Sequence, residues 1–269
     1  RLASGGRHGF AQSFFQVGGN FGQAIGPLLA AFVVLRNGQE SVSWFAVAAL
    51  VGIFVLWRVG RWYAEHRRVN AGRPTPSTTL AFDRRTVVVA LVVLAILTFT
   101  KNIYMSAIGN YYTFYVIERF NVGIQDSQIL LFAFIGASAA GVFFGGPIGD
   151  RFGAKFVIWF SILGALPFTL ALPYADFTWT VILSVVIGFI FSAAFPAIVV
   201  FAQELLPGRV GMVAGIFFGF AFCSGGIAAA ALGALADVRG IEYVFWLCSF
   251  LPLLGLLTVL LPSMKRPAG

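Results

Sequence analysis

Long apolar runs, separated by short polar hinges, make up almost the whole of this chain. An α-helix rises about 1.5 Å per residue, so about 20 apolar residues cross the roughly 30 Å hydrocarbon core of a bilayer. Eight runs reach that length. They predict transmembrane helices over residues 10–35, 42–62, 86–117, 126–147, 155–173, 177–202, 210–236 and 241–262.

The longest hydrophilic stretch divides these runs into a group of two and a group of six. It extends from Arg61 to Arg85 and contains two Arg-Arg pairs and two prolines, a composition typical of a flexible basic linker. We therefore expect two helices over 1–62, a linker over 63–85 and a six-helix bundle over 86–269.

Composition supports a membrane protein. The 269 residues are 59% hydrophobic and only 10% charged, whereas globular domains carry about 25% charged residues. The fold class predicted is all-α and integral to the membrane, with the lipid bilayer as its solvent.

The basic residues are distributed unevenly between the two sides of the predicted membrane. If the first helix runs outward, 14 of the 18 Lys and Arg residues fall on one side, and three (Arg36, Arg119 and Arg239) fall on the other. The positive-inside rule makes the first side cytoplasmic, and with it the linker and the C-terminus. The net charge of +8 is thus explained by topology, and no nucleic-acid partner is expected.

The polar turn Gly146-Pro147-Ile148-Gly149-Asp150-Arg151-Phe152-Gly153-Ala154-Lys155 interrupts two apolar runs. It resembles the signature loop of the major facilitator superfamily, which recurs after the second and eighth of twelve helices; the alternative is an ordinary basic loop. The resemblance implies a transporter that works by alternating access. Gly146, Asp150, Arg151, Gly153 and Lys155 would then form a conformational latch. We expect Asp150 to contact a neighbouring helix end or an arginine.

A weak internal repeat agrees with this fold. Gly6-Arg7-His8-Gly9 matches Gly208-Arg209-Val210-Gly211 at an offset of 202 residues. Parallel repeats are the way in which major facilitator transporters are built. The same offset would place a first signature loop upstream of residue 1, so we expect helices five to twelve of twelve, with residues 1–62 belonging to the first six-helix bundle.

Glycines four apart line the first predicted helix, at Gly18, Gly22 and Gly26, and Pro27 follows. This spacing lets another helix approach closely. The stretch resembles the fifth-helix motif of drug–proton antiporters, although Ser13, Ala30 and Ala31 stand where that motif has glycine. A tight helix pair with no bearing on transport direction is the alternative.

Lys101 lies deep within a predicted membrane helix. An isolated charge near the bilayer centre costs on the order of 3 kcal/mol or more, so such residues usually face a cavity or a partner. Snorkelling to the outer interface is the alternative. Lys101 shares a helical stripe with Tyr104, Met105, Ile108, Tyr112 and Tyr115, and Asn102, Asn110 and Tyr111 lie close by.

An ammonium among phenols and amides suits a small anionic ligand. We therefore predict a substrate site that includes Lys101, Asn102, Tyr104, Asn110, Tyr111 and Tyr112. Gly109, next to Asn110, is expected to loosen the helix there. Gln16 and Asn20, four apart on the first helix, could face the same cavity or could make interhelical hydrogen bonds.

Longer strings resemble the family of bacterial fosmidomycin resistance proteins. They are residues 1–9 and 15–20, Thr100-Lys101-Asn102-Ile103-Tyr104-Met105, Asn110-Tyr111-Tyr112-Thr113-Phe114-Tyr115 and residues 143–153. That resemblance implies efflux of a small phosphonate drug across the inner membrane by a monomeric proton antiporter. The alternatives are an organic-anion uptake symporter of the same fold and a non-transporting scaffold or receptor.

Enzymatic chemistry is not expected. The apolar runs contain no Ser-His-Asp arrangement, no phosphate-binding loop and no metal-ligand spacing, so neither a metal nor a cofactor is predicted. Carboxylates are scarce in the membrane; Glu118 and Glu204 lie near helix ends.

Overall fold

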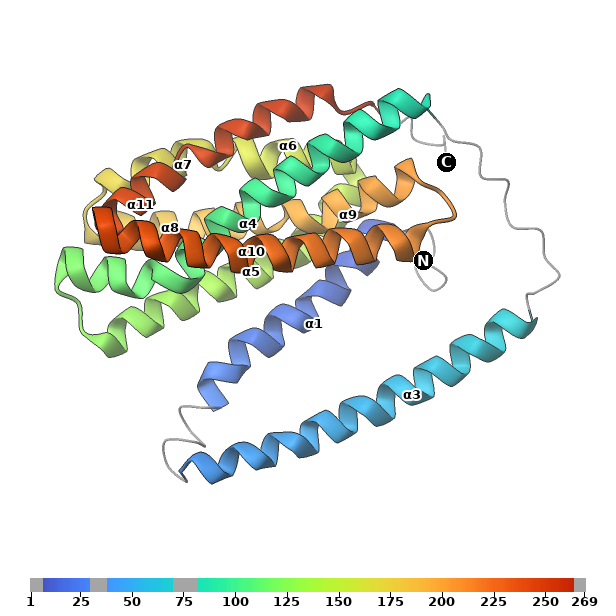
Figure 1. Cartoon of the computed structure of the whole chain (residues 1–269), viewed down its shortest axis with the longest axis horizontal. Helices are drawn as coiled ribbons and strands as arrows, with labels where there is room; N and C mark the ends of the chain where they lie inside the picture. Colours follow the sequence, from blue (N-terminus) through green and yellow to red (C-terminus); the bar gives the residue numbers. More distant parts are fainter. Residues whose placement is uncertain (1–6, 30–37, 70–81, 264–269) are drawn as a thin grey trace. The chain divides into compact units, whose positions relative to one another are not determined.

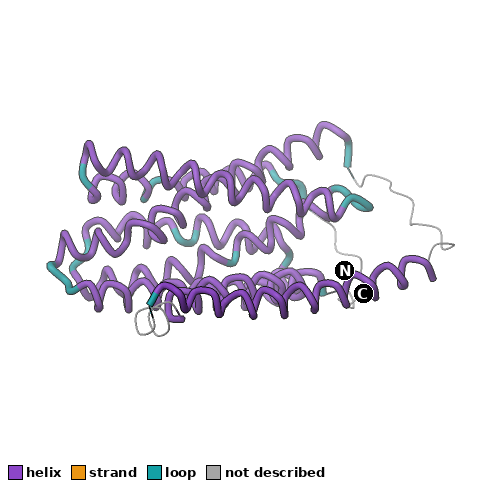
Figure 2. Tube along the Cα trace, turned by 60° about the horizontal axis from the view of Figure 1, so that its bottom comes forward, coloured by secondary structure: helices purple, strands orange, loops and turns teal. Residues whose placement is uncertain are grey.

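The computed structural model describes residues 7–29, 38–69 and 82–263, and every regular element in those ranges is a helix (Figures 1 and 2). The elements are α1 (His8–Leu29), η2 (Gln39–Trp44), α3 (Phe45–Val69), α4 (Arg84–Phe120), α5 (Ile124–Phe152), α6 (Ala154–Leu163), α7 (Leu166–Ala171), η3 (Leu172–Tyr174), α8 (Phe177–Ser192), α9 (Ala194–Leu205), α10 (Val210–Arg239), α11 (Ile241–Cys248) and η4 (Leu251–Leu260).

Seven helical segments of the described ranges are long and apolar enough to cross a membrane. They are Phe45–Glu65, Arg84–Phe120, Ile124–Phe152, Ala154–Tyr174, Phe177–Leu205, Val210–Arg239 and Ile241–Leu260. Each coincides with one of the predicted runs. The remaining predicted run corresponds to α1, a helix of 22 residues that is not among these seven.

Three of the predicted transmembrane spans are interrupted, and a proline explains the position of each interruption. Proline lacks an N–H donor, and its ring collides with the carbonyl four residues earlier. Helix α6 ends at Leu163, four residues before Pro167, and α8 ends at Ser192, four residues before Pro196. In the same way α11 ends four residues before Pro252. The interruptions therefore follow from local chain chemistry.

The expected helix ends needed revision at the linker. Helix α3 continues to Val69 and α4 begins at Arg84, so both helices extend into the stretch predicted as linker. Ala, Glu and Arg in the extension of α3 are good helix formers and give no stop signal. At the other boundary Asp83 caps α4, because its carboxylate accepts from the Arg85 N–H at 3.4 Å.

The described chain divides into two compact units. One contains residues 1–20 and 80–269, and the other contains residues 21–79. In the first unit, α4 packs against α10, α5 against α8, and α6 against α9 (Figure 1). Helix α9 is apolar on every side apart from its last turn, and nearly all of its residues are buried, so it lies at the centre of this unit.

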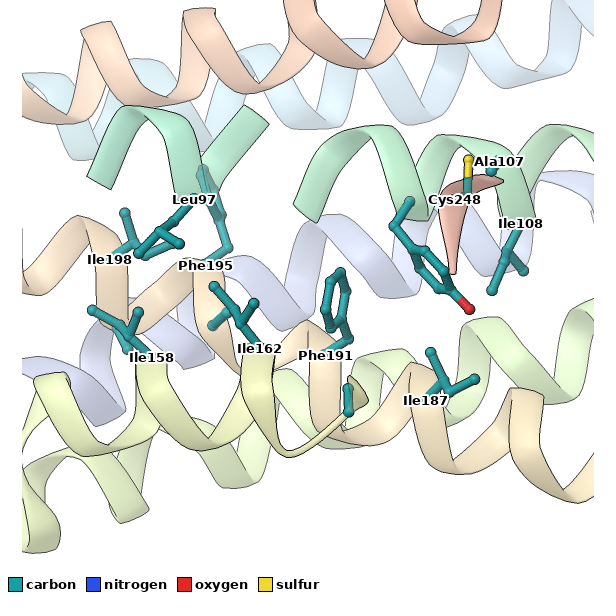
Figure 3. Close-up of a cluster of buried hydrophobic side chains, with 14 of the residues drawn as sticks. Leu97, Ala107, Ile108, Ile158, Ile162, Ile187, Phe191, Phe195, Ile198 and Cys248 are labelled. Carbon is teal, nitrogen blue, oxygen red and sulfur yellow. The ribbon is translucent and has the colours of Figure 1, made fainter. Parts of the chain in front are cut away.

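The core of this unit is built from aliphatic and aromatic side chains of α4, α6, α8, α9 and α11. Figure 3 shows part of it, including Leu97, Ile162, Ile187 and Phe191. Cys248 is buried in this core, as expected for a packing residue, whereas Cys223 is exposed.

Candidate functional site

Asp150 caps a helix other than its own. Its two carboxylate oxygens accept hydrogen bonds from the backbone N–H groups of Gly9, at 2.7 Å, and Phe10, at 2.9 Å. Both groups belong to the first turn of α1, where N–H groups have no partner within the helix and the helix dipole is positive. The prediction that Asp150 contacts a neighbouring helix end is therefore confirmed.

Gly9 and Gly146 let α1 and α5 cross at close range beside this carboxylate. A Cβ added at Gly9 would lie 2.6 Å from the Gly146 carbonyl oxygen, and one added at Gly146 would collide with the Ser13 side chain. Any larger residue would force the two helices apart. Gly146 was expected to be a turn residue, but it lies inside α5, where its role is close packing.

The turn itself is a single residue. Gly153 ends α5 and precedes α6, with φ of +95°, a conformation that favours glycine. Next to it, the Lys155 ammonium donates to the carbonyl oxygen of Leu261, which ties α6 to the end of η4. The Arg151 guanidinium lies over the Phe152 ring at 5.5 Å. Asp150 and Lys155 thus bind helix ends to one another.

A cavity of about 1190 Å³ adjoins the Asp150 contact. It is lined by parts of α1, α5, α6, α9 and η4, and its titratable or charged side chains are His8, Asp150, Lys155 and Glu204. Lys101 and its neighbours on α4 do not line this cavity. The predicted latch residues and the predicted substrate residues are therefore two separate clusters.

The polar residues on one face of α4 bind α10. The Asn102 amide donates to Ser224 Oγ at 3.4 Å, and the Tyr111 hydroxyl donates to the Ala229 carbonyl at 2.6 Å. Between them Ser106 Oγ donates to the carbonyl of a neighbouring residue of α10 at 3.0 Å. These bonds compete with any ligand for the Asn102 amide and the Tyr111 hydroxyl.

The phenols on another face of α4 lie in the core. The Tyr104 ring packs on Phe191, with centroids 5.2 Å apart, and its buried hydroxyl has no hydrogen-bond partner among the described residues. The Tyr112 hydroxyl is 3.0 Å from Ser184 Oγ. Tyr104 and Tyr112 are therefore buried in the core and do not lie on the exposed surface of α4.

Lys101 lies near the middle of α4 and is half-buried. Its ammonium lies over the ring of Phe195, 5.2 Å from the ring centroid, and it makes no ion pair with any carboxylate of the described chain. An aromatic face attracts the positive charge of a cation without neutralising it. That charge is the feature of this region most suited to binding an anion.

The second half of α4 differs from expectation. The helix runs without a break from Arg84 to Phe120, so Gly109 does not loosen it. The break at mid-helix occurs instead between α8 and α9, where Pro196 supplies the physical cause. Asn110 is exposed, and its amide donates to the Ser106 carbonyl at 2.9 Å.

The predicted residues of α1 are placed only in part. Gln16 and Asn20 are half-buried, and the Gln16 Nε2 atom has no partner among the described residues. A Cβ added at Gly18 or Gly22 would meet no described atom within 4 Å. Gly26 and Pro27 lie in α1, but their surroundings are outside the described part of the structure. The close-packing role of this stripe stays a prediction.

Comparison with known proteins decides the family. The family model described as Major Facilitator Superfamily matches residues 91–269, which is more than half of the chain. The chain belongs to the major facilitator superfamily. It is accordingly part of a multi-pass membrane protein of a transporter family, and not an enzyme.

Two curated relatives refine the comparison. The fosmidomycin resistance protein of Escherichia coli (strain K12) is 56% identical over 266 residues, which cover 99% of this chain and 66% of that protein. The uncharacterized MFS-type transporter YfnC of Bacillus subtilis (strain 168) is 39% identical over 268 residues, covering 98% of this chain and 66% of that protein. The chain thus spans about two thirds of the length of the relatives that it matches.

Sequence reasoning missed a cluster around Arg119 at the far end of α4. Its guanidinium donates to the Tyr115 hydroxyl at 2.8 Å and to the carbonyl oxygens of Pro173 and Ala175, and it lies 4.0 Å from a Glu242 carboxylate oxygen. Arg119 therefore joins α4, the chain around η3 and α11. The sequence shows only a single arginine near a helix end, which carries no such signal.

Proposed function

We propose that this chain forms part of an inner-membrane transporter that exports a small anionic drug, of the fosmidomycin-like phosphonate class, in exchange for protons. The single observation that carries the proposal is the Lys101 ammonium, which lies mid-helix without a carboxylate partner in the described chain. The substrate class also draws on the 56% identity to a protein named for fosmidomycin resistance.

The proposed site is smaller than the set of residues predicted from the sequence. Lys101 supplies the charge. The exposed Asn110 lies nine residues further along α4, where its amide donates to Ser106, and it remains a candidate contact. Asn102 and Tyr111 would support the site from the contact between α4 and α10, while Tyr104 and Tyr112 support α4 from the core. Gln16 and Asn20 on α1 remain candidate contacts.

The Asp150 contact would serve as the latch of alternating access. Its hold on the first turn of α1 would keep α1 and α5 together at that end of the unit. On the orientation proposed from the basic residues, this end is cytoplasmic, so the closed latch belongs to the outward-facing state. Release of α1 would open the site to the cytoplasm.

The test is substrate binding and export by Lys101 variants of the intact transporter. Lys101→Ala should abolish saturable binding of a radiolabelled phosphonate and its accumulation in inverted membrane vesicles, whereas Lys101→Arg should retain part of both, because the charge remains. Wild-type accumulation should depend on an imposed proton gradient. Normal binding by Lys101→Ala would remove the site, and phosphonate uptake in the reverse direction would favour a symporter.

A further inference from the structure

Phe195 is the side chain that the Lys101 ammonium contacts. The Nζ atom lies 5.2 Å from the ring centroid, within the range of a cation–π interaction, and only 7% of Phe195 is exposed. Figure 3 shows the ring extending from α9 toward α4, beside Leu97. The cation is thus covered on one side by a buried aromatic face.

We infer that Phe195 is a positioning residue for the substrate site, and that its ring holds the Lys101 ammonium in the place where a compact anion binds. This inference rests on the proposed function, since it takes Lys101 as the anion-binding group. It goes further by assigning a role to a residue of a different helix.

Phe195 follows the break between α8 and α9. Helix α8 ends at Ser192 and α9 begins at Ala194, because Pro196 cannot continue the hydrogen-bond ladder. Phe195 therefore lies in the first turn of α9, directly after the interruption.

Two further rings hold Phe195 in place. Phe218 of α10 packs against it with centroids 5.2 Å apart and planes at 87°, and Phe15 of α1 packs against Phe218 with centroids 6.3 Å apart and planes at 90°. Edge-to-face pairs of this geometry are favourable and restrict ring rotation. The three rings form an aromatic column, Phe15–Phe218–Phe195, that ends at the Lys101 ammonium.

An aromatic face suits this role better than a carboxylate would. A carboxylate would neutralise the ammonium and would have to be displaced by the substrate anion. A ring attracts the cation through its quadrupole, carries no net charge and leaves N–H donors of the ammonium directed elsewhere. The ring thus holds the ammonium without neutralising it, so an incoming anion does not have to displace a carboxylate.

The decisive experiment replaces Phe195 by phenylalanine analogues with one, two and three ring fluorines in the intact transporter. Fluorination weakens the ring quadrupole stepwise while changing the shape very little. The affinity for a phosphonate should fall stepwise, by roughly five- to thirty-fold at the end of the series, which corresponds to the usual strength of a cation–π interaction. The loss should appear in KM, with the maximal transport rate nearly unchanged.

Phe191 provides the matched control. It is buried in α8, one turn before Phe195, and it packs on Tyr104 instead of a cation. The same fluorine series at Phe191 should leave phosphonate affinity unchanged. Phe195→Leu should weaken binding more than Phe191→Leu, although both remove a ring from the core.

The outcomes separate this inference from the proposed function. If Lys101→Ala abolishes binding and the Phe195 series is flat, Phe195 is only a packing residue and the positioning role is overturned. If Lys101→Ala binds phosphonate normally, the proposed site fails, whatever the fluorine series shows. A stepwise loss at Phe195, together with loss of binding in Lys101→Ala, would support both.

Discussion

Replacing Asp150 by asparagine should weaken the contact between α5 and the N-terminus of α1. The carboxylate accepts from the N–H groups of Gly9 at 2.7 Å and Phe10 at 2.9 Å. Asparagine has one acceptor oxygen and no charge, so one hydrogen bond and the attraction to the helix dipole are lost. An exposed charge at a helix N-terminus contributes about 0.3–1 kcal/mol, and a typical hydrogen bond about 0.5–1.5 kcal/mol.

Asp150 is exposed, so the lower part of these ranges applies. We expect a loss of about 1 kcal/mol, which is roughly a fivefold shift in the equilibrium between the held and released α1. Hydrogen exchange reads this shift directly, because Gly9 and Phe10 donate the two N–H groups. Their exchange in the intact transporter should accelerate by about fivefold.

Asp176→Asn is the control for this experiment. Asp176 caps α8 in a comparable way, since its carboxylate accepts from the Trp179 N–H at 2.8 Å. That substitution should accelerate exchange in the first turn of α8 and leave Gly9 and Phe10 unchanged. Unaltered exchange at Gly9 and Phe10 in Asp150→Asn would refute the capping argument, and equal effects of both substitutions would show a general loss of stability.

Three further pairs of substitutions test the packing around the two clusters and around Arg119. Gly146→Ala should destabilise the α1–α5 crossing by about 1–3 kcal/mol and lower the melting temperature, whereas Gly149→Ala, whose added Cβ would lie 3.7 Å from its nearest neighbour, should be tolerated. Tyr112→Phe should cost about 1 kcal/mol of unfolding free energy in denaturant titrations, because it leaves a buried serine hydroxyl with one partner fewer; Tyr104→Phe removes a hydroxyl that has no partner in the described chain and should be neutral or stabilising. Arg119→Lys should lower the melting temperature nearly as much as Arg119→Gln, since lysine cannot reproduce the forked donors that reach two carbonyls; full stability of the lysine variant would contradict that geometry.

The positions of the membrane-spanning helices and the family could be predicted from the sequence with little error. Apolar runs of membrane length have few alternatives to helices, because lipid offers backbone N–H and carbonyl groups no partners. The Asp150 contact was also predictable, since a carboxylate in a charged turn between helices has few favourable partners other than a helix N-terminus or an arginine. Gly146 was wrongly predicted to lie in the turn, because glycine is common both in turns and at close helix crossings.

The candidate substrate site shows where prediction from the sequence ends. Period and spacing put Lys101, Asn102, Tyr104 and Tyr112 near one another on α4, but they do not say which neighbouring helix each residue meets. In the structure Asn102 binds α10, while Tyr104 and Tyr112 enter the core. Residues that were predicted to lie together on α4 therefore contact different neighbouring helices, and each contact has its own chemistry.

By itself the sequence determined that this chain crosses a membrane repeatedly, where its helices lie and to which superfamily it belongs, because these properties depend on hydropathy and on local motifs. Tertiary structure decided which polar groups are already engaged. Phe195 follows Lys101 by 94 residues, and Gly9 precedes Asp150 by 141. Only the packing of α9 on α4, and of α1 on α5, brings these residues together, since side-chain contact between helices depends on how the helices cross.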